Sequence, residues 1–456
     1  MTARPWRVAV VGAGPSGMYA AGYLSGHFDG PWAPSGVVDG VVAGRPVEVD
    51  VYDRLPTPWG LVRGGVAPDH PTKKDVTRVF DAVSARPGVR FLGGVELGRD
   101  VSVADLAQWY DAVVHAHGAR GGARLDVDGG DLPGVHTAHD VVAWYNGHPD
   151  HTGLGVDLTG ARVIVVGNGN VALDVARVLA LPEQVLARTD VAAHAEAALR
   201  DAATTEIVVT GRRGPEHAAF GTAELEELAA VPGVDVVVDP ADVPADDAAL
   251  PGPVRRRLDV LRGLAVRGPT GAPRRVTLRF RTRPAAVLGT ETVTGVRLEG
   301  PGGVEDLATS TVVLAVGYRS APVEGLPFDT DRHLLPTRDG RVVDADGAAI
   351  PGAYATGWIR RGPSGMIGTN KACARGTVAA LAADAAAGLL PTGGTLDPDA
   401  VLDRLAGHAV VAWEGWRAID HLETTRGREE GRPRRKLVTH DELHAGARGR
   451  AAAAAG

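Results

Sequence analysis

Two stretches of the chain repeat one pattern, in which an apolar run leads into closely spaced glycines and then into an apolar run of helical period. The first is "VAVVGAGPSGMYAAGYL", residues 8–24, and the second is "VVGNGNVALDVARVLA", residues 165–180. A short continuous apolar run is typical of a buried strand, and apolar positions three and four residues apart predict a helix. The pattern therefore predicts two strand–turn–helix units.

The first unit has the spacing of a dinucleotide-binding turn. Gly12, Gly14 and Gly17 stand in Gly-x-Gly-x-x-Gly spacing: the first glycine permits the tight turn, the second lets a pyrophosphate approach, and the third lets helix and strand pack. The next expected strand, "PVEVDVYDR", ends at Asp53, whose carboxylate can accept a hydrogen bond from a ribose hydroxyl. Because the usual distance to this acid is only about 20 residues, a loop insertion is expected within residues 29–46.

The second unit ends differently. Gly167, Gly169 and Ala172 form a Gly-x-Gly-x-x-Ala turn, and the next expected strand, "TEIVVTG", is followed by Arg212 and Arg213. Two guanidiniums suit a 2′-phosphate, which they can bind through charge-assisted hydrogen bonds. The alternative is a pair of solvated arginines at a strand end that binds no ligand. The two turns together predict FAD at the first site and NADPH, in preference to NADH, at the second.

Length and composition limit the alternatives. A chain of 456 residues is expected to form two domains, and 44% hydrophobic with 23% charged residues is typical of a globular protein. The net charge of -7 argues against a nucleic-acid partner. The absence of a long apolar run predicts no membrane span, and a start that leads directly into a strand predicts a cytoplasmic location.

Cys373 is the single cysteine of the chain. One cysteine cannot form a dithiol, a four-cysteine zinc site or a cysteine-ligated iron–sulfur cluster, and no metal site is predicted. A flavin in this chain must therefore pass its electrons to an external acceptor.

Other segments are predicted from their local patterns. Residues 55–74 are expected to be a structured loop, and "GPSGMIGTNK" is expected to lead into a helix from near Met366. "RVTLRFRTRPAAVLGT" and "ETVTGVRLEG" predict a hairpin, "STVVLAVGYRS" a strand returning to the first domain, and the chain from about residue 446 a disordered tail.

Six strings carry a resemblance that covers residues 6–443 in order: "VVGAGPSG", "LPTPWGLVRGGVAPDHP", "VVGNGNVALDVAR", "GRRGPEHAAF", "TAELEEL" and "GWIRRGPSGMIGTNK". With them the chain resembles the adrenodoxin-reductase-like ferredoxin–NADP reductases. The resemblance implies an α/β, glutathione-reductase-like fold of two Rossmann-like domains. An NADPH domain of residues 119–318 would be inserted into an FAD domain formed by residues 1–118 and 319–456, with hinges near Gly118 and Gly317.

The resemblance also implies roles for individual residues. His70 and Glu227 match a histidine and an acid near the flavin edge; without the motif, His70 would be a loop histidine satisfied by its neighbours and Glu227 part of a solvated helix face. The implied FAD contacts are Gly12, Gly14, Pro15, Ser16, Gly17, Asp53, Leu61, Trp358, Gly365, Met366 and Ile367. The implied NADP contacts are Asn168, Gly169, Asn170, Val171, Arg212, Arg213 and Glu224, and Gly365 is expected to touch both cofactors.

The chain also departs from the family pattern. Asp53 stands where the family usually has a glutamate, and "VVHAHGA" puts His115 and His117 near a hinge, in place of a more apolar strand. "LDVDGGDLPG" differs from a more usual Pro-Gly-Glu pattern.

The implied activity is that of a ferredoxin–NADP reductase, with an acidic ferredoxin as partner and a cytochrome P450 as a common final acceptor. A docking contribution is expected from Arg255, Arg256, Arg257 and Arg262, which can also be a solvated charge run. The alternatives are an NADPH-dependent flavin monooxygenase or diaphorase, and a redox-sensing module that binds nucleotides without turnover.

Overall fold

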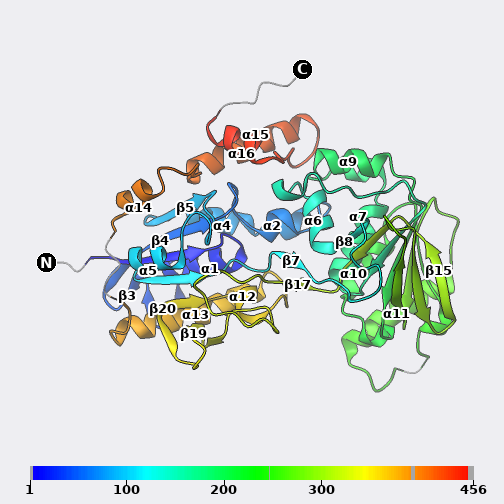
Figure 1. Cartoon of the computed structure of the whole chain (residues 1–456), viewed down its shortest axis with the longest axis horizontal. Helices are drawn as coiled ribbons and strands as arrows, with labels where there is room; N and C mark the ends of the chain where they lie inside the picture. The colour runs from blue at the N-terminus through cyan, green and yellow to red at the C-terminus, as the bar shows by residue number, and fades with distance from the viewer. Residues whose placement is uncertain (1–3, 246, 392–395, 450–456) are drawn as a thin grey trace.

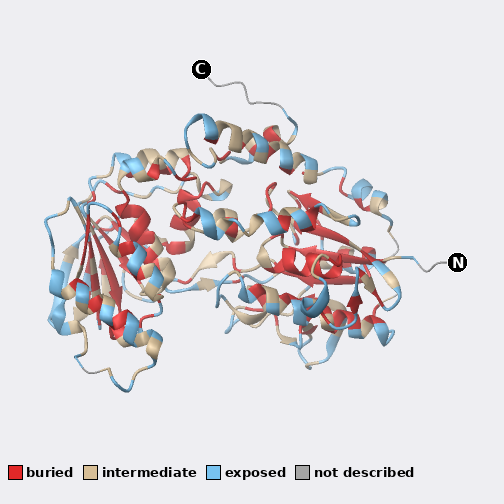
Figure 2. Cartoon of the chain, turned by 180° about the vertical axis from the view of Figure 1, so that it is seen from behind, coloured by how far each residue is buried: buried red, intermediate tan, exposed pale blue. Residues whose placement is uncertain are grey.

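Two α/β bodies lie side by side in the computed structural model, which describes residues 4–245, 247–391 and 396–449 (Figure 1). In the first body helices cover both faces of the sheet, whereas in the second body helices cover one face and a small antiparallel sheet covers the other. Buried residues concentrate in the strands and in the helix faces against them (Figure 2). Within the described part of the chain, no helix combines the length and apolar character that crossing a bilayer requires. The α/β class with two dinucleotide-binding bodies is as predicted.

The first body is built on a parallel core of strands drawn from both ends of the chain. The core strands in spatial order are β5 (Val89–Gly93), β4 (Arg45–Asp53), β1 (Trp6–Val11), β6 (Ala112–His115) and β20 (Ala349–Ala355). Antiparallel strands extend both edges: β3 (Val41–Val42) and β2 (Val37–Val38) beyond β4, and β19 (Arg341–Val343) and β18 (Thr337–Arg338) beyond β20. Every residue of β1 is buried, as expected for a parallel strand covered on both faces.

Helices from distant parts of the chain cover this sheet. They are α1 (Pro15–Leu24), α4 (Thr77–Ser84), α5 (Val103–Trp109) and α13 (Thr369–Ala386). Helices α1 and α13 pack against each other, so the carboxy-terminal segment closes the first body. The expected insertion between the first helix and β4 contains η1 (Gly30–Trp32) and the β2–β3 hairpin.

The second body contains the repeated strand–turn–helix unit. Its parallel strands in spatial order are β11 (Val234–Val238), β12 (Arg274–Phe280), β10 (Glu206–Gly211), β9 (Arg162–Val166), β16 (Thr311–Leu314) and β8 (Val135–Thr137). Its helical segments are α6 (Ala138–Tyr145), η2 (Pro149–His151), α7 (Asn170–Ala180), α8 (Glu183–Leu186), α9 (Ala193–Arg200), η3 (Pro215–His217), α10 (Thr222–Ala229), η4 (Pro240–Asp242) and α11 (Gly252–Arg267). An antiparallel sheet of β13 (Arg283–Leu288), β14 (Gly295–Gly300) and β15 (Gly303–Ala308) completes the body.

Two strand predictions for this body were wrong in their pairing. The expected hairpin splits, because the first half of its leading strand forms β12 inside the parallel sheet, and only β13 pairs with β14. The strand expected to return to the first body is β16, which stays in the second sheet beside β9. Alternating and continuous apolar runs identify strands, but strand partners depend on contacts that are distant in sequence.

Two other local predictions need correction. The segment of residues 55–74 contains the one-turn helices α2 (Leu61–Gly64) and α3 (Pro71–Lys74) within its loop. The expected disordered tail begins too early, because α16 (His440–Ala447) includes residues 446 and 447; residues 450–456 lie outside the described part.

Short strands and a carboxy-terminal arm join the two bodies. β7 (Gly121–Gly122) and β17 (Tyr318–Arg319) pair with each other between them (Figure 1). The arm contains α14 (Pro398–Arg404), α15 (Trp413–Glu429) and α16, and passes over the top of the molecule in the same view. Arg432 and Arg435 of this arm form ion pairs with Glu196 of α9, at 2.9 Å in each case.

Candidate functional site

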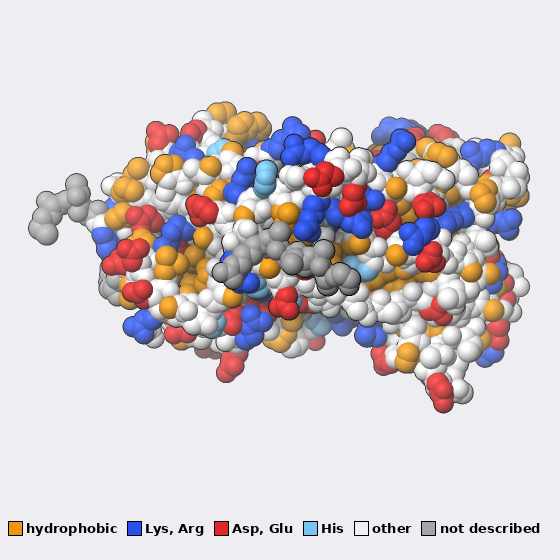
Figure 3. All heavy atoms as spheres, turned by 90° about the horizontal axis from the view of Figure 1, so that it is seen from above, with side chains coloured by type: hydrophobic (Ala, Val, Ile, Leu, Met, Phe, Trp, Pro, Cys, Tyr) orange, Lys and Arg blue, Asp and Glu red, His pale blue; other side chains and the backbone are white. Residues whose placement is uncertain are grey.

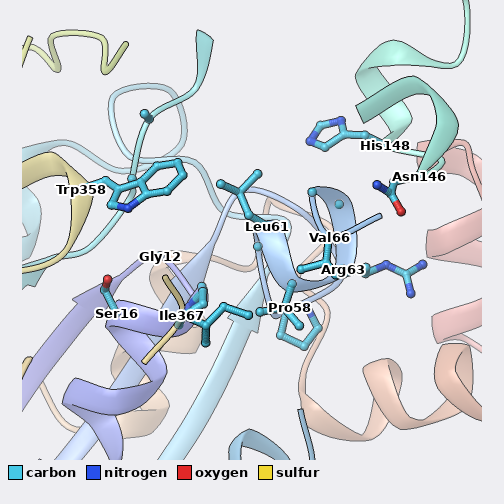
Figure 4. Close-up of a pocket in the computed structure, with 18 of the residues that line it drawn as sticks. Gly12, Ser16, Pro58, Leu61, Arg63, Val66, Asn146, His148, Trp358 and Ile367 are labelled. Atoms are coloured by element: carbon cyan, nitrogen blue, oxygen red, sulfur yellow. The ribbon is translucent and has the colours of Figure 1, made fainter. Parts of the chain in front are cut away.

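A cavity of 740 Å³ lies where the two bodies meet, and segments of both form its wall. The first body contributes the β1–α1 turn, residues 52–66 and residues 365–368, and the second contributes parts of α6, α7 and α10. Figure 4 shows Gly12, Ser16, Trp358 and Ile367 on one side of Leu61, with His148 and Asn146 on the other. The cavity thus connects the two repeated units.

The first glycine turn leaves no room for side chains on its inner face but is open toward the cavity. At Gly12, φ is +111°, and an added Cβ would lie 2.6 Å from the carbonyl oxygen of Ala116. A Cβ on Gly17 would lie 1.8 Å from the carbonyl oxygen of Gly12, so α1 packs directly on the turn. At Gly14 an added Cβ would meet nothing closer than 3.9 Å. The N-terminus of α1 has no side-chain cap, and its N–H groups can therefore bind a pyrophosphate.

Asp53 ends β4 beside this turn and lines the cavity. Its Oδ2 accepts a hydrogen bond from the Ala13 N–H at 2.9 Å, and its Oδ1 accepts one from the Leu55 N–H at 3.0 Å. Burial raises the pKa of Asp53, and these two backbone N–H groups oppose that rise. Each carboxylate oxygen has a further lone pair, which suits a ribose hydroxyl.

The second glycine turn has the same construction with one difference. At Gly167, φ is +133°, and an added Cβ would lie 2.3 Å from the carbonyl oxygen of Ala315. Ala172 occupies the third position, where its Cβ is accommodated between helix and strand. Helix α7 begins at Asn170 after Gly169 without a side-chain cap, so its first N–H groups also lack intrahelical partners.

Exposed arginines follow the second strand end. Neither Arg212 nor Arg213 forms an ion pair with a described residue, and both are exposed. Asn168 has its Nδ2 buried with no hydrogen-bond partner among the described residues. A Cβ on Gly211 would lie 2.5 Å from that Nδ2, so Asn168 lies beside the strand end from which the arginines extend. Unpaired guanidiniums and an unpaired amide donor together suit an anionic ligand.

His70 and Glu227 meet across the junction of the two bodies. The His70 Nε2 is 3.0 Å from Glu227 Oε2, and the His70 Nδ1 is 3.4 Å from the Arg177 guanidinium. Arg177 in turn pairs with Asp69 at 2.7 Å. Burial lowers the pKa of His70, and the charge of Arg177 lowers it further. The loop before α3 is thereby tied to α7 and α10 of the second body.

Most of the predicted site residues line the cavity. Those that do are Gly12, Gly14, Pro15, Ser16, Asp53, Leu61, His70, Asn170, Val171, Glu224, Trp358, Gly365, Met366 and Ile367. Those outside its lining are Gly17, Asn168, Gly169, Arg212, Arg213 and Glu227. Of this second set, Gly17 lies inside the first turn, and Glu227 touches the lining through His70.

The helix expected from near Met366 begins three residues later, at Thr369. Gly365 has φ +79°, and the Met366 N–H donates to Thr369 Oγ1 at 3.2 Å, so residues 366–369 form a turn before the helix. The side chain of Met366 is exposed, and its backbone neighbours line the cavity.

Sequence reasoning left the role of two histidines open. His117 lines the cavity, and its Nε2 is buried with no hydrogen-bond partner among the described residues; the same holds for the His115 Nδ1 behind it. Burial lowers the pKa of His115 to about 4, which keeps it neutral. The two histidines in "VVHAHGA" are the sequence signal that marks these positions. Thr356, whose buried Oγ1 also lacks a partner in the described structure, had no such signal.

The expected docking arginines on α11 are only partly available. Arg257 is buried and donates to the backbone carbonyl of Phe220 at 3.2 Å, so its assignment to an exposed patch was wrong. Arg262 pairs with Asp247 and Asp259, each at 2.8 Å. Helix α11 lies along the lower side of the second body in the view of Figure 1.

The face with the carboxy-terminal arm also has basic side chains. Viewed from that side, Lys and Arg side chains are interspersed with Asp and Glu across both bodies (Figure 3). Arg417 and Arg428 of α15 are exposed.

Comparison with known proteins gives full-length relatives, although no family model matches the chain. The chain is 42% identical over 467 residues to "NADPH-ferredoxin reductase FprA" of Mycobacterium tuberculosis, covering 96% of this chain and 98% of that protein. It is 36% identical over 481 residues to "NADPH:adrenodoxin oxidoreductase, mitochondrial" of Arabidopsis thaliana, covering 98% and 96%. The solved structure of Mycobacterium tuberculosis FprA in complex with NADPH superposes with a TM-score of 0.89 at 40% identity, covering 98% of this chain and all of that one.

The two glycine turns on either side of one cavity define a class, the glutathione-reductase-like oxidoreductases with two dinucleotide-binding domains. Within that class, the identity and coverage of the relatives show that the chain belongs to the adrenodoxin-reductase-like ferredoxin–NADP reductases, which use FAD and NADP.

Proposed function

We propose that this protein oxidises NADPH and passes the electrons through FAD to a ferredoxin-type iron–sulfur protein. The observation that carries the proposal is the cavity that lies between the two nucleotide turns, because it gives two bound dinucleotides a common space. Bound FAD supplies the conversion, since a flavin takes up a hydride as an electron pair and can release electrons singly, which NADPH cannot readily do. With Cys373 as the single cysteine, the chain has no dithiol through which to reduce a disulfide.

The first turn and the residues around it are proposed to hold FAD. The N-terminus of α1 receives the pyrophosphate and Asp53 the ribose, and Gly17 keeps α1 packed against the turn. Trp358 and the turn at residues 365–367 face this part of the cavity from the carboxy-terminal segment. The residues proposed to contact FAD are Gly12, Gly14, Pro15, Ser16, Gly17, Asp53, Leu61, Trp358, Gly365, Met366 and Ile367.

The second turn is proposed to hold NADPH. Arg212 and Arg213 bind the 2′-phosphate, which NADH lacks, and the free N–H groups of α7 bind the pyrophosphate. The residues proposed to contact NADP are Asn168, Gly169, Asn170, Val171, Arg212, Arg213 and Glu224, with Gly365 touching both cofactors.

His70 and Glu227 are proposed to orient the nicotinamide rather than to move a proton. Hydride transfer to a flavin needs alignment of two rings, and the His70–Glu227 contact ties the wall of the first body to the second. His70 lines the cavity and is therefore placed to touch a bound nucleotide.

The arrangement of the sheets supports a proposed division into two domains. We place the FAD domain in residues 1–118 and 319–456 and the NADPH domain in residues 119–318, because β7 and β17 pair at the junction next to Gly118 and Gly317. The cytoplasmic location, the acidity of the ferredoxin and a cytochrome P450 as final acceptor belong to the same proposal. The exposed Arg255 and Arg256 on α11 are the part of the predicted docking patch that is free to attract an acidic partner.

The test is NADPH-driven reduction of cytochrome c in the presence and absence of an added ferredoxin. We expect reduction to require ferredoxin and to slow as salt is added, because an acidic partner is attracted electrostatically. Charge reversal of Arg255 and Arg256 should slow it at low salt only; the same reversal of Arg417 and Arg428 compares the two basic regions.

Other outcomes would favour the alternatives. Rapid NADPH consumption by oxygen, with hydroxylated product, would support the monooxygenase interpretation. Reduction of quinones without any response to ferredoxin would support a diaphorase. Bound nucleotides without turnover would support a sensing module.

A further inference from the structure

Imidazole and carboxylate side chains gather at the start of α6, outside the two glycine turns. His139 and Asp140 lie in the first turn of α6, and His151 ends η2. The Asp140 Oδ1 is 3.1 Å from His139 Nδ1 and 3.9 Å from His151 Nδ1, and one donor atom from each residue lies within 4.8 Å of the others. Among the described residues, no other group of His, Cys, Asp or Glu meets this condition.

The carboxylate is oriented by a neighbouring hydroxyl. Thr137 Oγ1 donates to Asp140 Oδ2 at 2.8 Å, which leaves Oδ1 facing the two imidazoles. Metal-binding carboxylates commonly have such a hydrogen bond on the oxygen that does not bind the ion. The hydrogen bond from Thr137 therefore fixes the orientation of the Asp140 carboxylate, as is usual for a metal ligand.

The two imidazoles are held by ring contacts. The His139 ring meets the His151 ring edge to face at 5.3 Å and the Tyr318 ring at 5.7 Å. His148 lies close to His151, at 5.0 Å, but its ring nitrogens already contact the Arg54 guanidinium and the Asp150 N–H.

The charge around the group also permits a cation. Arg54 is the basic side chain beside these histidines, and it forms an ion pair with Asp150 at 2.5 Å. Asp150 also contacts the His440 Nε2 at 2.7 Å. The carboxylate of Asp150 thus partly neutralises Arg54 and reduces its repulsion of a cation bound near His139, Asp140 and His151.

We propose that His139, Asp140 and His151 form a binding site for a divalent transition-metal cation of the zinc or cobalt type. Imidazole nitrogen with one carboxylate oxygen suits these ions, whereas magnesium and calcium prefer oxygen ligands. Tetrahedral bonds of about 2.0–2.2 Å put ligand atoms about 3.3–3.6 Å apart, and the distances of 3.1 and 3.9 Å lie on either side of that range.

The site adjoins the cavity without belonging to the proposed nucleotide contacts. His139 lines the cavity, and three protein ligands leave a fourth position for water. The sequence predicts no metal site, because a chain with one cysteine lacks the common cysteine-based ligand sets. The three ligands proposed here lie on two separate segments, so no compact motif marks them.

The test is calorimetric titration of the untagged, FAD-loaded protein with zinc chloride after treatment with a chelator. We expect one ion per chain, and no comparable binding of magnesium. His139→Gln, Asp140→Asn and His151→Gln should each weaken binding at least about tenfold. The matched control is His421→Gln, which removes an exposed histidine of α15 and should leave the affinity unchanged.

A second measurement needs no variant. Crystals of the unaltered protein soaked in zinc should show an anomalous peak between His139, Asp140 and His151. The proposal is overturned if zinc does not bind, if the His139→Gln/His151→Gln double variant binds it as tightly as the unaltered protein, or if the anomalous peak lies elsewhere.

Discussion

The two glycine turns share their backbone construction but differ in what surrounds them. At the first, Asp53 is fixed by two backbone N–H groups and lines the cavity. At the second, Arg212 and Arg213 are exposed and have no ion-pair partner among the described residues. A fixed, enclosed polar group suits a ligand that stays bound, because little ordering is needed when it binds. Exposed cations without an ion-pair partner suit a ligand that enters and leaves.

The two turns also differ in how closely helix and turn pack. Gly17 cannot accept a Cβ, because that atom would lie 1.8 Å from the carbonyl oxygen of Gly12. Ala172 already has a Cβ at the equivalent position of the second turn, where it is buried without crowding. The glycine therefore lets helix and turn pack more closely at the first turn than the alanine does at the second.

The largest effect is expected from exchanging these two residues. Gly17→Ala should abolish FAD binding, because the added atom would meet the backbone carbonyl of Gly12, which cannot move away without opening the turn. The matched change, Ala172→Gly, should cost about 1 kcal/mol or less and leave FAD bound. Flavin absorbance per chain after purification measures both. A yellow Gly17→Ala protein with a full complement of FAD would contradict the tight packing described for the first turn.

A second test concerns the anchor behind the first site. Glu423 is buried and accepts from Arg63, which lines the cavity, at 2.6 Å, and from Arg434 at 2.7 Å. Glu423→Gln would leave the Arg63 guanidinium without its charge partner, whereas Arg434 would keep Asp420 at 2.8 Å. The substitution should lower the free energy of unfolding by about 3–5 kcal/mol. Chemical denaturation measures the change; Glu429→Gln, an exposed acid on the same helix, is the control.

Low pH should remove the stabilisation that the Glu423 carboxylate provides. Burial raises the pKa of Glu423, but Arg63 and Arg434 outweigh burial and hold it at about 2, below its ordinary 4.5. The folded-state pKa is depressed, so the contribution is complete above pH 4.5 and is lost as the pH falls toward 2. The stability difference between the unaltered protein and Glu423→Gln should shrink across that window. A difference that stayed constant would show that the carboxylate charge is not its source.

A smaller effect is expected at the second site. Replacing Arg212 and Arg213 together with Ala removes charge-assisted hydrogen bonds to the 2′-phosphate and should raise the KM for NADPH about 10- to 100-fold. The KM for NADH should change little. Steady-state kinetics with both nucleotides measure this, and Arg255→Ala/Arg256→Ala provides a matched pair of exposed arginines. An equal loss for both nucleotides would place the arginines away from the 2′-phosphate.

The smallest effect is expected at the junction of the two sites. His70→Gln and Glu227→Gln should each slow hydride transfer about 2- to 10-fold, and the double variant should be no slower than either, because the two residues act through one contact. Single-turnover flavin reduction measures the three rates. If the rate losses of the two single variants added up in the double variant, His70 and Glu227 would act independently. An unchanged rate for His70→Gln would show that His70 does not position the nicotinamide.

Local features of this fold could be predicted from the sequence because they depend on neighbouring residues. The two turns, the strand ending at Asp53 and the arginines after β10 follow from glycine spacing and short apolar runs. The α/β class and the family followed from the same motifs.

Features that depend on distant contacts could not be predicted. Burial of Arg257 results from its contact with the Phe220 carbonyl, and its sequence neighbourhood resembles an exposed charge run. The pairing of β12 within the parallel sheet and the approach of His151 to Asp140 also require the folded chain. Helix α13 begins later than predicted because Thr369 bonds to the backbone of Met366.

We expect the enclosed site to keep FAD bound while the open site admits NADPH in preference to NADH. Anaerobic stopped-flow reduction of the purified protein by each nucleotide tests it most directly. We expect a yellow protein whose flavin is bleached at least about tenfold faster by NADPH than by NADH at equal, subsaturating concentration, since one charge-assisted contact is worth about that factor. A colourless protein, or equal bleaching by the two nucleotides, would contradict it.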